Sequence, residues 1–262
     1  MNIKQFWQLA GLVAGVLAHA VSWADMRHAI VRVKPSVVLV GTFDQTHSPR
    51  FSLRGTGFIV GDGHLALTNA HVLQAALGAD GQATPVILLK GENQEWEVRT
   101  LTVLEMDAPH DLALLRFAGP GAPALSLRDS DTVREGQAIA FMGFPMGGAL
   151  GFSPVTHRGM VSSIAPVALP ASSARQLHER SILSLREAGR FDIFQLDATA
   201  YPGNSGGPLF DPDTGEVLGI VNMVSIKGTR ESALTNPSGI SYAIPSGQIL
   251  KLLQRHQTPS VR

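Results

Sequence analysis

The stretch YPGNSGGPLF at residues 201–210 sets one serine, Ser205, among glycines that the interior of a strand or helix would not favour. Such a serine is a candidate nucleophile, and the pattern Gly-x-Ser-x-Gly around it fits two known arrangements. In one, a helix follows the serine at once, and the acid and the histidine come later in the chain. In the other, the histidine and the aspartate come first and the serine lies in a loop.

The residues after Ser205 argue against the first arrangement. Pro208 and the turn-forming segment 211–215 follow within a few residues, so a helix cannot readily begin there. The one histidine after Ser205 is His256, close to the end of a predicted C-terminal helix. The residues around Ser205 therefore exclude the first arrangement.

Two upstream residues suit the second arrangement. LALTNAHVL puts His71 where an apolar strand ends, and HDLALL puts Asp111 at the start of an almost wholly apolar run. Burial of an unpaired carboxylate is costly, so Asp111 needs a partner, for which His71 is the candidate. Taken alone, His71 also fits a structural histidine, and Asp111 fits a cap or a turn residue. Together, in the order histidine, aspartate, serine, they indicate nucleophilic catalysis.

The rest of the chain has short strand-like segments separated by Gly, Pro, Asn and Asp turns. They form two series of six, and the turn-rich segment 118–131 between the series predicts a connection. Long helical patterns between strands are missing, which favours two packed antiparallel β units over a doubly wound sheet. Helices are expected before the first strand and over 245–255. The expected strands are 36–43, 55–61, 65–70, 85–91, 95–105, 111–117, 137–143, 155–165, 191–198, 207–210, 216–224 and 239–245.

The N-terminus has the order of a secretory signal peptide. Residues 1–24 contain an early cation, Lys4, an apolar stretch from Leu9 to about Val21 and small residues up to Ala24. We expect cleavage near Ala24 and export to a bacterial-type periplasm or medium, with no stable membrane anchor once the signal is removed. An uncleaved anchor is the alternative.

Composition excludes several classes of partner and site. Lys plus Arg and Asp plus Glu both total 21, so the charge balance does not suggest nucleic acid. The chain has no cysteine, which excludes a thiol nucleophile and thiolate zinc sites. The histidines form no spaced cluster with carboxylates, so we expect no metal and no cofactor.

Several motifs resemble the trypsin-like serine proteases, and most closely their high-temperature-requirement (HtrA) branch. The resemblance covers residues from about 30 to 254. It is carried by the motifs GTGFIV (55–60), LTNAHV (67–72), DLALL (111–115), GFP (143–145), GNSGGPL (203–209), GIV (219–221) and GISYAIPSG (239–247).

The resemblance implies an all-β fold of two six-stranded antiparallel β-barrels, with the active site between them and a C-terminal helix. It implies a catalytic triad of His71, Asp111 and Ser205. We expect the N-terminal barrel, with its short leading helix, within 25–120, and the C-terminal barrel and helix within 121–262. Together these would form one peptidase domain.

The resemblance also implies roles for the residues near Ser205. The backbone N–H groups of Gly203 and Ser205 would bind the oxyanion of the reaction. Asn204 stands where digestive trypsins carry an aspartate that pairs with a new N-terminus, so we expect activity without an activating cut. A pocket without a carboxylate predicts a small or aliphatic P1 residue, the substrate residue before the cleaved bond. The expected pocket residues are Thr199, Ile220, Val221 and Met223.

We therefore expect an exported serine endopeptidase that acts on polypeptides, with misfolded exported proteins as candidate substrates. The alternative is a catalytically silent, protease-like module that binds extended peptides. HtrA proteins usually carry PDZ domains, and only 15 residues follow Gly247, so we expect no PDZ domain. The inserted segment 166–190 is expected to form a surface loop with one helical piece. The sequence predicts no oligomeric state.

Overall fold

A computed structural model describes residues 26–77, 83–91, 93–145, 151–166, 191–222 and 240–257. The expected signal peptide, Met223 and nearly all of the inserted segment 166–190 lie outside these residues. Within the described ranges, no helix is both long enough and apolar enough to cross a membrane.

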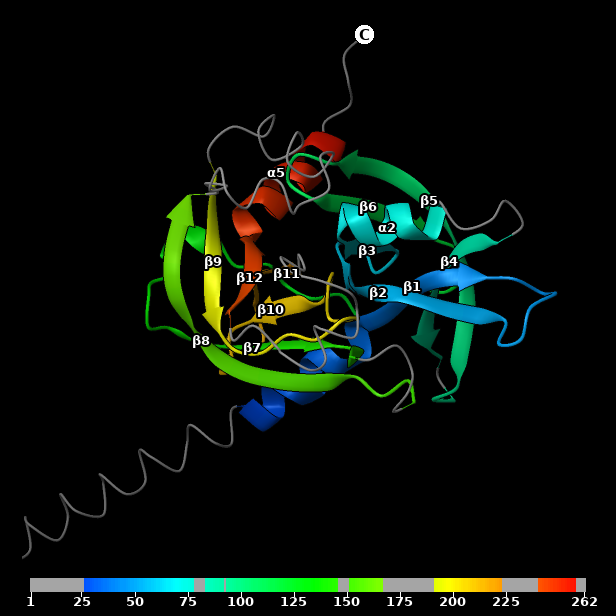
Figure 1. Cartoon of the computed structure of the whole chain (residues 1–262), viewed down its shortest axis with the longest axis horizontal. Coiled ribbons are helices and arrows are strands. Elements are labelled where there is room, and N and C mark those ends of the chain that lie inside the picture. The colour runs from blue at the N-terminus through cyan, green and yellow to red at the C-terminus, as the bar shows by residue number, and fades with distance from the viewer. Residues whose placement is uncertain are drawn as a thin grey trace, which may run out of the picture.

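The strands form two closed antiparallel barrels that stand side by side (Figure 1). The first barrel has the strand order β1-β2-β3-β6-β5-β4. Because neighbouring strands are antiparallel, short turns join most of them. The strands are β1 (Val37–Phe43), β2 (Phe51–Val60), β3 (Leu65–Thr68), β4 (Thr84–Lys90), β5 (Trp96–Asp107) and β6 (Leu112–Phe117).

The second barrel has the order β10-β11-β12-β9-β8-β7. It is built from β7 (Ala138–Gly143), β8 (Val155–Pro166), β9 (Asp192–Asp197), β10 (Pro208–Phe210), β11 (Val217–Asn222) and β12 (Ile240–Pro245). All twelve expected strands are present, and the prediction of two six-stranded barrels with a C-terminal helix is confirmed. The main differences are an earlier start of β2 and an earlier end of β3.

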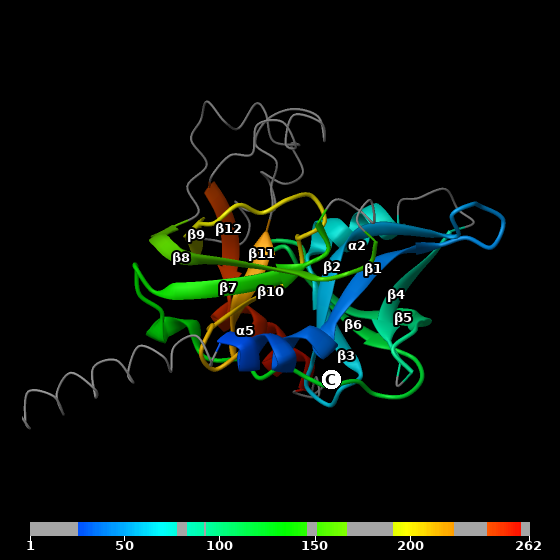
Figure 2. The same ribbon diagram turned by 90° about the horizontal axis from the view of Figure 1, so that it is seen from below.

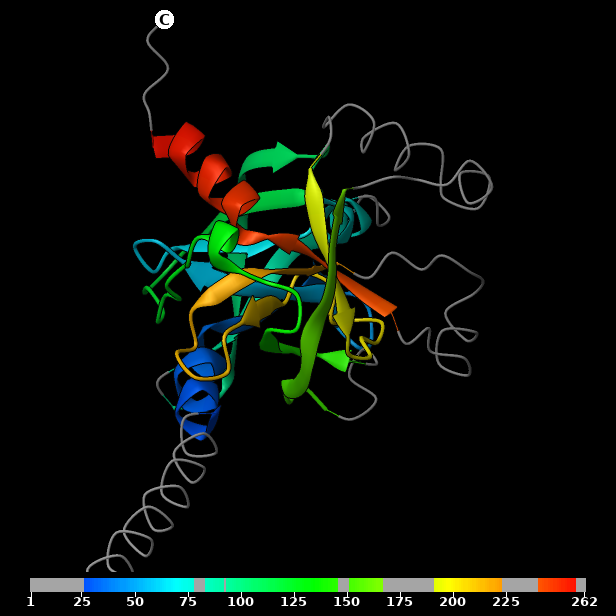
Figure 3. The ribbon, with the colours of Figure 1, turned by 90° about the vertical axis from the view of Figure 1, so that its left-hand side faces the viewer.

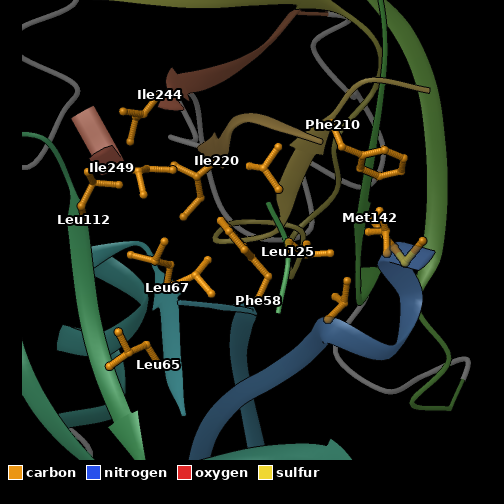
Figure 4. Close-up of a cluster of buried hydrophobic side chains, with 14 of the residues drawn as sticks. Phe58, Leu65, Leu67, Leu112, Leu125, Met142, Phe210, Ile220, Ile244 and Ile249 are labelled. Atoms are coloured by element: carbon orange, nitrogen blue, oxygen red, sulfur yellow. The ribbon is translucent and has the colours of Figure 1, made fainter. Parts of the chain in front are cut away.

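Three hydrophobic clusters explain why two barrels form. One cluster takes side chains from all six strands of the first barrel and from the helix that covers it, and another takes them from all six strands of the second barrel. The third lies between the barrels. Figure 4 shows Phe58 and Leu67 of the first barrel facing Ile220 and Ile244 of the second. Burial of this shared apolar surface holds the two barrels together.

The helix over residues 26–33 lies beside the second barrel, and the chain then forms the first barrel (Figure 2). Its buried residues Ala29 and Val33 pack in the cluster between the barrels, as their helical spacing predicts. Arg32 Nη1 donates to the backbone oxygen of Thr214, in the turn between β10 and β11, at 2.5 Å. The 3-10 turn η1 (Lys34–Ser36) then leads into β1.

Helix α5 (Ser246–Gln257) joins the barrels on another side; Figure 3 shows it in red to orange beside green strands of the first barrel. Ile249 and Leu252 are fully buried between the barrels. Arg255 donates to Asp107 and to Glu105 of β5, at 2.7 and 3.0 Å.

The N-terminal cap of α5 comes from another part of the chain. The hydroxyl of Ser246, the first residue of the helix, donates to the backbone oxygen of Arg128 at 2.5 Å. The N–H of Gly247 instead donates to the hydroxyl of Ser130, at 2.9 Å. Ser130 begins the 3-10 turn η2 (Ser130–Thr132), so a distant segment supplies the cap.

One helix was not expected from the sequence. Residues Ala70–Leu77 form α2, whereas the pattern predicted a strand up to residue 70 and no helix after it. Val72, Leu73 and Ala76 are buried against the first barrel at helical spacing. Because α2 has only eight residues and follows an apolar strand, its period is hard to separate from the strand pattern.

Candidate active site

His71 and Asp111 are in direct contact although 40 positions separate them in the chain. His71 lies in the first turn of α2, directly after β3, and Asp111 ends the turn between β5 and β6. Nδ1 of His71 lies 2.7 Å from Oδ2 of Asp111. The His71 side chain is 42% exposed and that of Asp111 is 18% exposed. The imidazole is therefore open to solvent while the carboxylate is mostly shielded.

Asp111 also holds the beginning of α2. Its Oδ1 accepts the backbone N–H of His71 at 2.8 Å, and its backbone oxygen accepts the N–H of Ala70 and the side-chain amide of Asn69, each at 3.1 Å. A carboxylate is favoured at the N-terminus of a helix, so the cap and the ion-pairing roles coincide. Because Nδ1 of His71 faces a carboxylate, it carries the ring proton, and Nε2 is the basic nitrogen.

The backbone of Asp111 is in the left-handed region, with φ at 51°. Aspartate adopts this region more readily than bulky residues, but surrounding contacts must hold it there. The N–H of Asp111 donates to the oxygen of Ala108 at 3.1 Å and closes the turn. This turn and the contacts with α2 together fix the direction of the carboxylate.

Asn222 supplies a third partner for Asp111, and it comes from the other barrel. Its Nδ2 donates to Oδ2 of Asp111 at 2.8 Å, from the last position of β11. The same carboxylate oxygen therefore receives a hydrogen bond from each barrel. Asn222 was not among the predicted site residues; the available signal was a polar residue within the otherwise apolar run of the predicted strand 216–224.

Ser205 lies in a tight loop before β10 and is 7% exposed. The N–H of Asn204 donates to the oxygen of Tyr201 at 2.9 Å, and that of Gly207 to the oxygen of Asn204 at 3.0 Å. Gly206 has φ at 87°, and a Cβ on it would lie 2.0 Å from the backbone oxygen of Thr56. A side chain at position 206 would thus both strain the loop and push it away from the first barrel.

Two links bring this loop next to the His71–Asp111 pair. The N–H of Gly206 donates to the oxygen of Val221 at 2.9 Å, and the next residue along β11 is Asn222, which holds Asp111. In addition, a Cβ on Gly55 would lie 2.7 Å from Val72 in α2 and 2.9 Å from the oxygen of Ser205. Gly55 therefore lies between α2 and the serine loop, where there is no room for a side chain.

The residue before Ser205 is buried and faces a histidine. Asn204 is fully buried, and its Nδ2 lies 3.4 Å from Nε2 of His157 in β8. The His157 ring stacks on Phe141, with centroids 4.7 Å apart and an angle of 18° between the planes. Burial lowers the pKa of His157 below the ordinary value of histidine. A neutral imidazole is the form that accepts from the Asn204 amide.

The expected substrate-pocket residues are not brought together as a set. Thr199 is partly buried in the segment after β9, and Met223 lies outside the described residues. Ile220 and Val221 are both fully buried. Ile220 packs between the barrels and Val221 packs inside the second barrel, because β11 is covered on both faces. Their place beside a substrate pocket therefore stays a prediction.

Metal ligands do not gather in the part of the chain that the structure describes. No group of three or more His, Asp or Glu side chains there could hold a metal ion. The polar groups of the site are hydroxyls, amides, the imidazoles of His71 and His157, and the carboxylate of Asp111. Such groups transfer protons and form hydrogen bonds.

Comparisons with known proteins agree on one family. The model of the trypsin-like peptidase domain matches residues 55–220. Human serine protease HTRA3 is 31% identical over 240 residues, which cover 89% of this chain and 45% of that protein. A probable periplasmic serine endoprotease, DegP-like, from Marinomonas sp. (strain MWYL1) is 28% identical, over 90% of this chain and 50% of that protein. The chain thus spans about half the length of these curated relatives.

A solved structure gives the same result at the level of the fold. The HtrA-type protease AlgW with tripeptide matches with a TM-score of 0.60 and 25% identity. The match covers 87% of this chain and 62% of the AlgW chain.

The environment of His157 predicts a pH dependence of stability. Its pKa is lower in the folded chain than in the unfolded chain, so the unfolded chain binds more protons below about pH 6.5. Stability should therefore fall as the pH drops from about 6.5 toward the lowered pKa.

His157→Gln removes the titrating imidazole but keeps a polar group beside Asn204, and the free energy of unfolding of this variant should fall less over the same pH range. Urea unfolding at several pH values measures this, with the exposed His28→Gln as the matched control. Parallel curves for wild type and His157→Gln would refute the assignment.

Proposed function

This chain belongs to the trypsin-like peptidase family, and from that premise we propose that it is a serine endopeptidase. The observation that carries the proposal is the contact of 2.7 Å between His71 and Asp111, beside a loop that presents Ser205. A protein that only binds peptides has no need of a histidine held in one tautomer by a shielded carboxylate. We propose His71, Asp111 and Ser205 as the catalytic triad.

In the proposed reaction, the Ser205 hydroxyl oxygen attacks the carbonyl carbon of a peptide bond while Nε2 of His71 takes the hydroxyl proton. The imidazolium that forms is stabilised by Asp111. His71 then gives the proton to the leaving amine, and water repeats the sequence on the acyl-enzyme to release the acid and restore the Ser205 hydroxyl. The backbone N–H groups of Gly203 and Ser205 are proposed to hold the oxyanion, with the positive φ of Gly203, 103°, as support.

The resemblance to DegP-like and HtrA proteases supports the other parts of the proposal. The first is named a probable periplasmic enzyme, which supports export of this chain with removal of residues 1–24 near Ala24. The AlgW structure contains a tripeptide, which supports polypeptides as substrates. We propose misfolded exported proteins as one class of these polypeptides. We propose that residues 25–120 and 121–262 form the two halves of one peptidase domain.

The proposal predicts that purified protein beginning near Asp25 cleaves casein or another unfolded protein. Ser205→Ala should lower kcat by about 10⁴- to 10⁶-fold, since no other hydroxyl replaces the nucleophile. Ser162→Ala, at an exposed serine of β8, is the matched control and should cleave like wild type. Peptide binding, measured by fluorescence anisotropy, should persist in Ser205→Ala. Equal inactivity of wild type and Ser205→Ala, with peptide binding in both, would favour the silent binding module instead.

Two finer properties are proposed with this activity. Because Asn204 is neutral and faces His157, it cannot form an ion pair with a new N-terminus, so no activating cut is required. Because Thr199 carries no charge, a small or aliphatic P1 residue is preferred over Lys or Arg. A peptide-library cleavage profile of protein that has not been clipped tests both. Cleavage after Lys or Arg, or activity only after clipping, would contradict the respective property.

A further inference from the structure

Thr56 in β2 uses every one of its polar groups, and it is fully buried. Its backbone N–H donates to the oxygen of Ser205 at 2.8 Å. Its hydroxyl donates to the oxygen of Gly203 at 2.6 Å and accepts the N–H of Phe144 at 3.1 Å. A first-barrel residue thus holds two carbonyl groups of the serine loop, which belongs to the second barrel.

The two carbonyls that Thr56 holds lie on either side of one peptide. The oxygen of Gly203 belongs to the peptide before Asn204, and the oxygen of Ser205 belongs to the peptide after Ser205. Between them is the peptide whose N–H is that of Ser205, one of the two proposed oxyanion donors. Because each peptide is planar, fixing the carbonyls on both sides leaves little freedom for that N–H to turn.

The anchor itself is tied to the catalytic histidine. The hydroxyl of Thr68, the last residue of β3, donates to the backbone oxygen of Thr56 at 2.7 Å. His71 follows Thr68 in the chain by three positions. The loop of Ser205 and the strand that leads to His71 therefore meet at Thr56, and a shift of one is passed to the other.

From these contacts we propose that the Thr56 hydroxyl is the positioning group of the oxyanion loop, an inference that rests on the proposed peptidase function. Thr56 touches no substrate. It acts by holding the carbonyl of Gly203, so that the N–H group of Ser205 keeps the direction that the tetrahedral intermediate requires. Glycine at position 203 makes such a clamp necessary, since glycine by itself restrains neither φ nor ψ.

The hydroxyl cannot be replaced by solvent. Thr56 is fully buried, and a Cβ on Gly143 would lie 3.0 Å from its Oγ1 and 2.8 Å from Oδ1 of Asn204, so the space around it is filled. A valine at position 56 has nearly the same shape and keeps the backbone N–H bond to Ser205. It would leave the oxygen of Gly203 and the N–H of Phe144 without this partner.

The test compares Thr56→Val with Thr56→Ser, which keeps the hydroxyl. Thr56→Val should lower kcat by about 10- to 100-fold with KM changed less than about 3-fold, because loss of a whole oxyanion donor costs about 10²- to 10³-fold. Thr56→Ser should stay within about 3-fold of wild type. A peptide boronic acid, whose tetrahedral adduct has an oxygen in the oxyanion position, should bind Thr56→Val more weakly by the same factor as kcat/KM falls.

Ser246→Ala is the control for the loss of a buried hydroxyl remote from the loop. It should lower the unfolding temperature and leave kcat unchanged, which a purely structural role of Thr56 would also do. If Thr56→Val does not fold, Thr56→Ala is measured in the same way. A wild-type kcat in Thr56→Val, or an equal loss in Thr56→Ser, overturns the inference while the peptidase function stands. Inactivity of wild type towards every substrate overturns the function, and the inference with it.

Discussion

The site depends on the hydrogen bonds to the carboxylate of Asp111, because both barrels supply them. From the first barrel it receives the ring and the backbone N–H of His71, and from the second it receives the amide of Asn222. A carboxylate that is mostly shielded from water needs such donors in place of the water it has lost. Its contact with Nδ1 of His71 also fixes the tautomer of the imidazole. The hydrogen bond from Asn222 therefore ties the His71–Asp111 pair of the first barrel to the second barrel.

Docking in turn comes from apolar burial that has no part in the chemistry. Phe58 and Leu67 meet Ile220 and Ile244 between the barrels, and α5 closes the same cluster with Ile249. Each barrel brings one half of the site to this contact: the first carries the histidine and the aspartate, and the second carries the serine loop. Thr56 and Asn222 are the polar links that cross from one half to the other. The hydrophobic cluster brings the halves together, and these hydrogen bonds set their relative position.

Local patterns predicted much of this fold, and long-range contacts explain what they missed. Alternating short strands and turns predicted all twelve strands, and the order histidine, aspartate, serine predicted His71, Asp111 and Ser205 as the candidate triad. The partners of Asn222 and Thr56 lie 111 and 147 positions away, so no local pattern could identify them. The apolar run around Ile220 and Val221 did not show that these two residues pack in different hydrophobic clusters, because burial of a strand on both faces depends on its neighbours in the fold.

The central claim is that docking of the barrels makes Ser205 a nucleophile through His71 and Asp111. The most direct measurement is labelling of the chain from Asp25 with a fluorophosphonate, followed by mass mapping of the modified peptide. The account predicts one phosphonate, on Ser205, with a labelling rate that falls steeply in Asp111→Asn because the imidazole then takes the wrong tautomer. Absence of label, a label on another serine, or an unchanged rate in Asp111→Asn would contradict it.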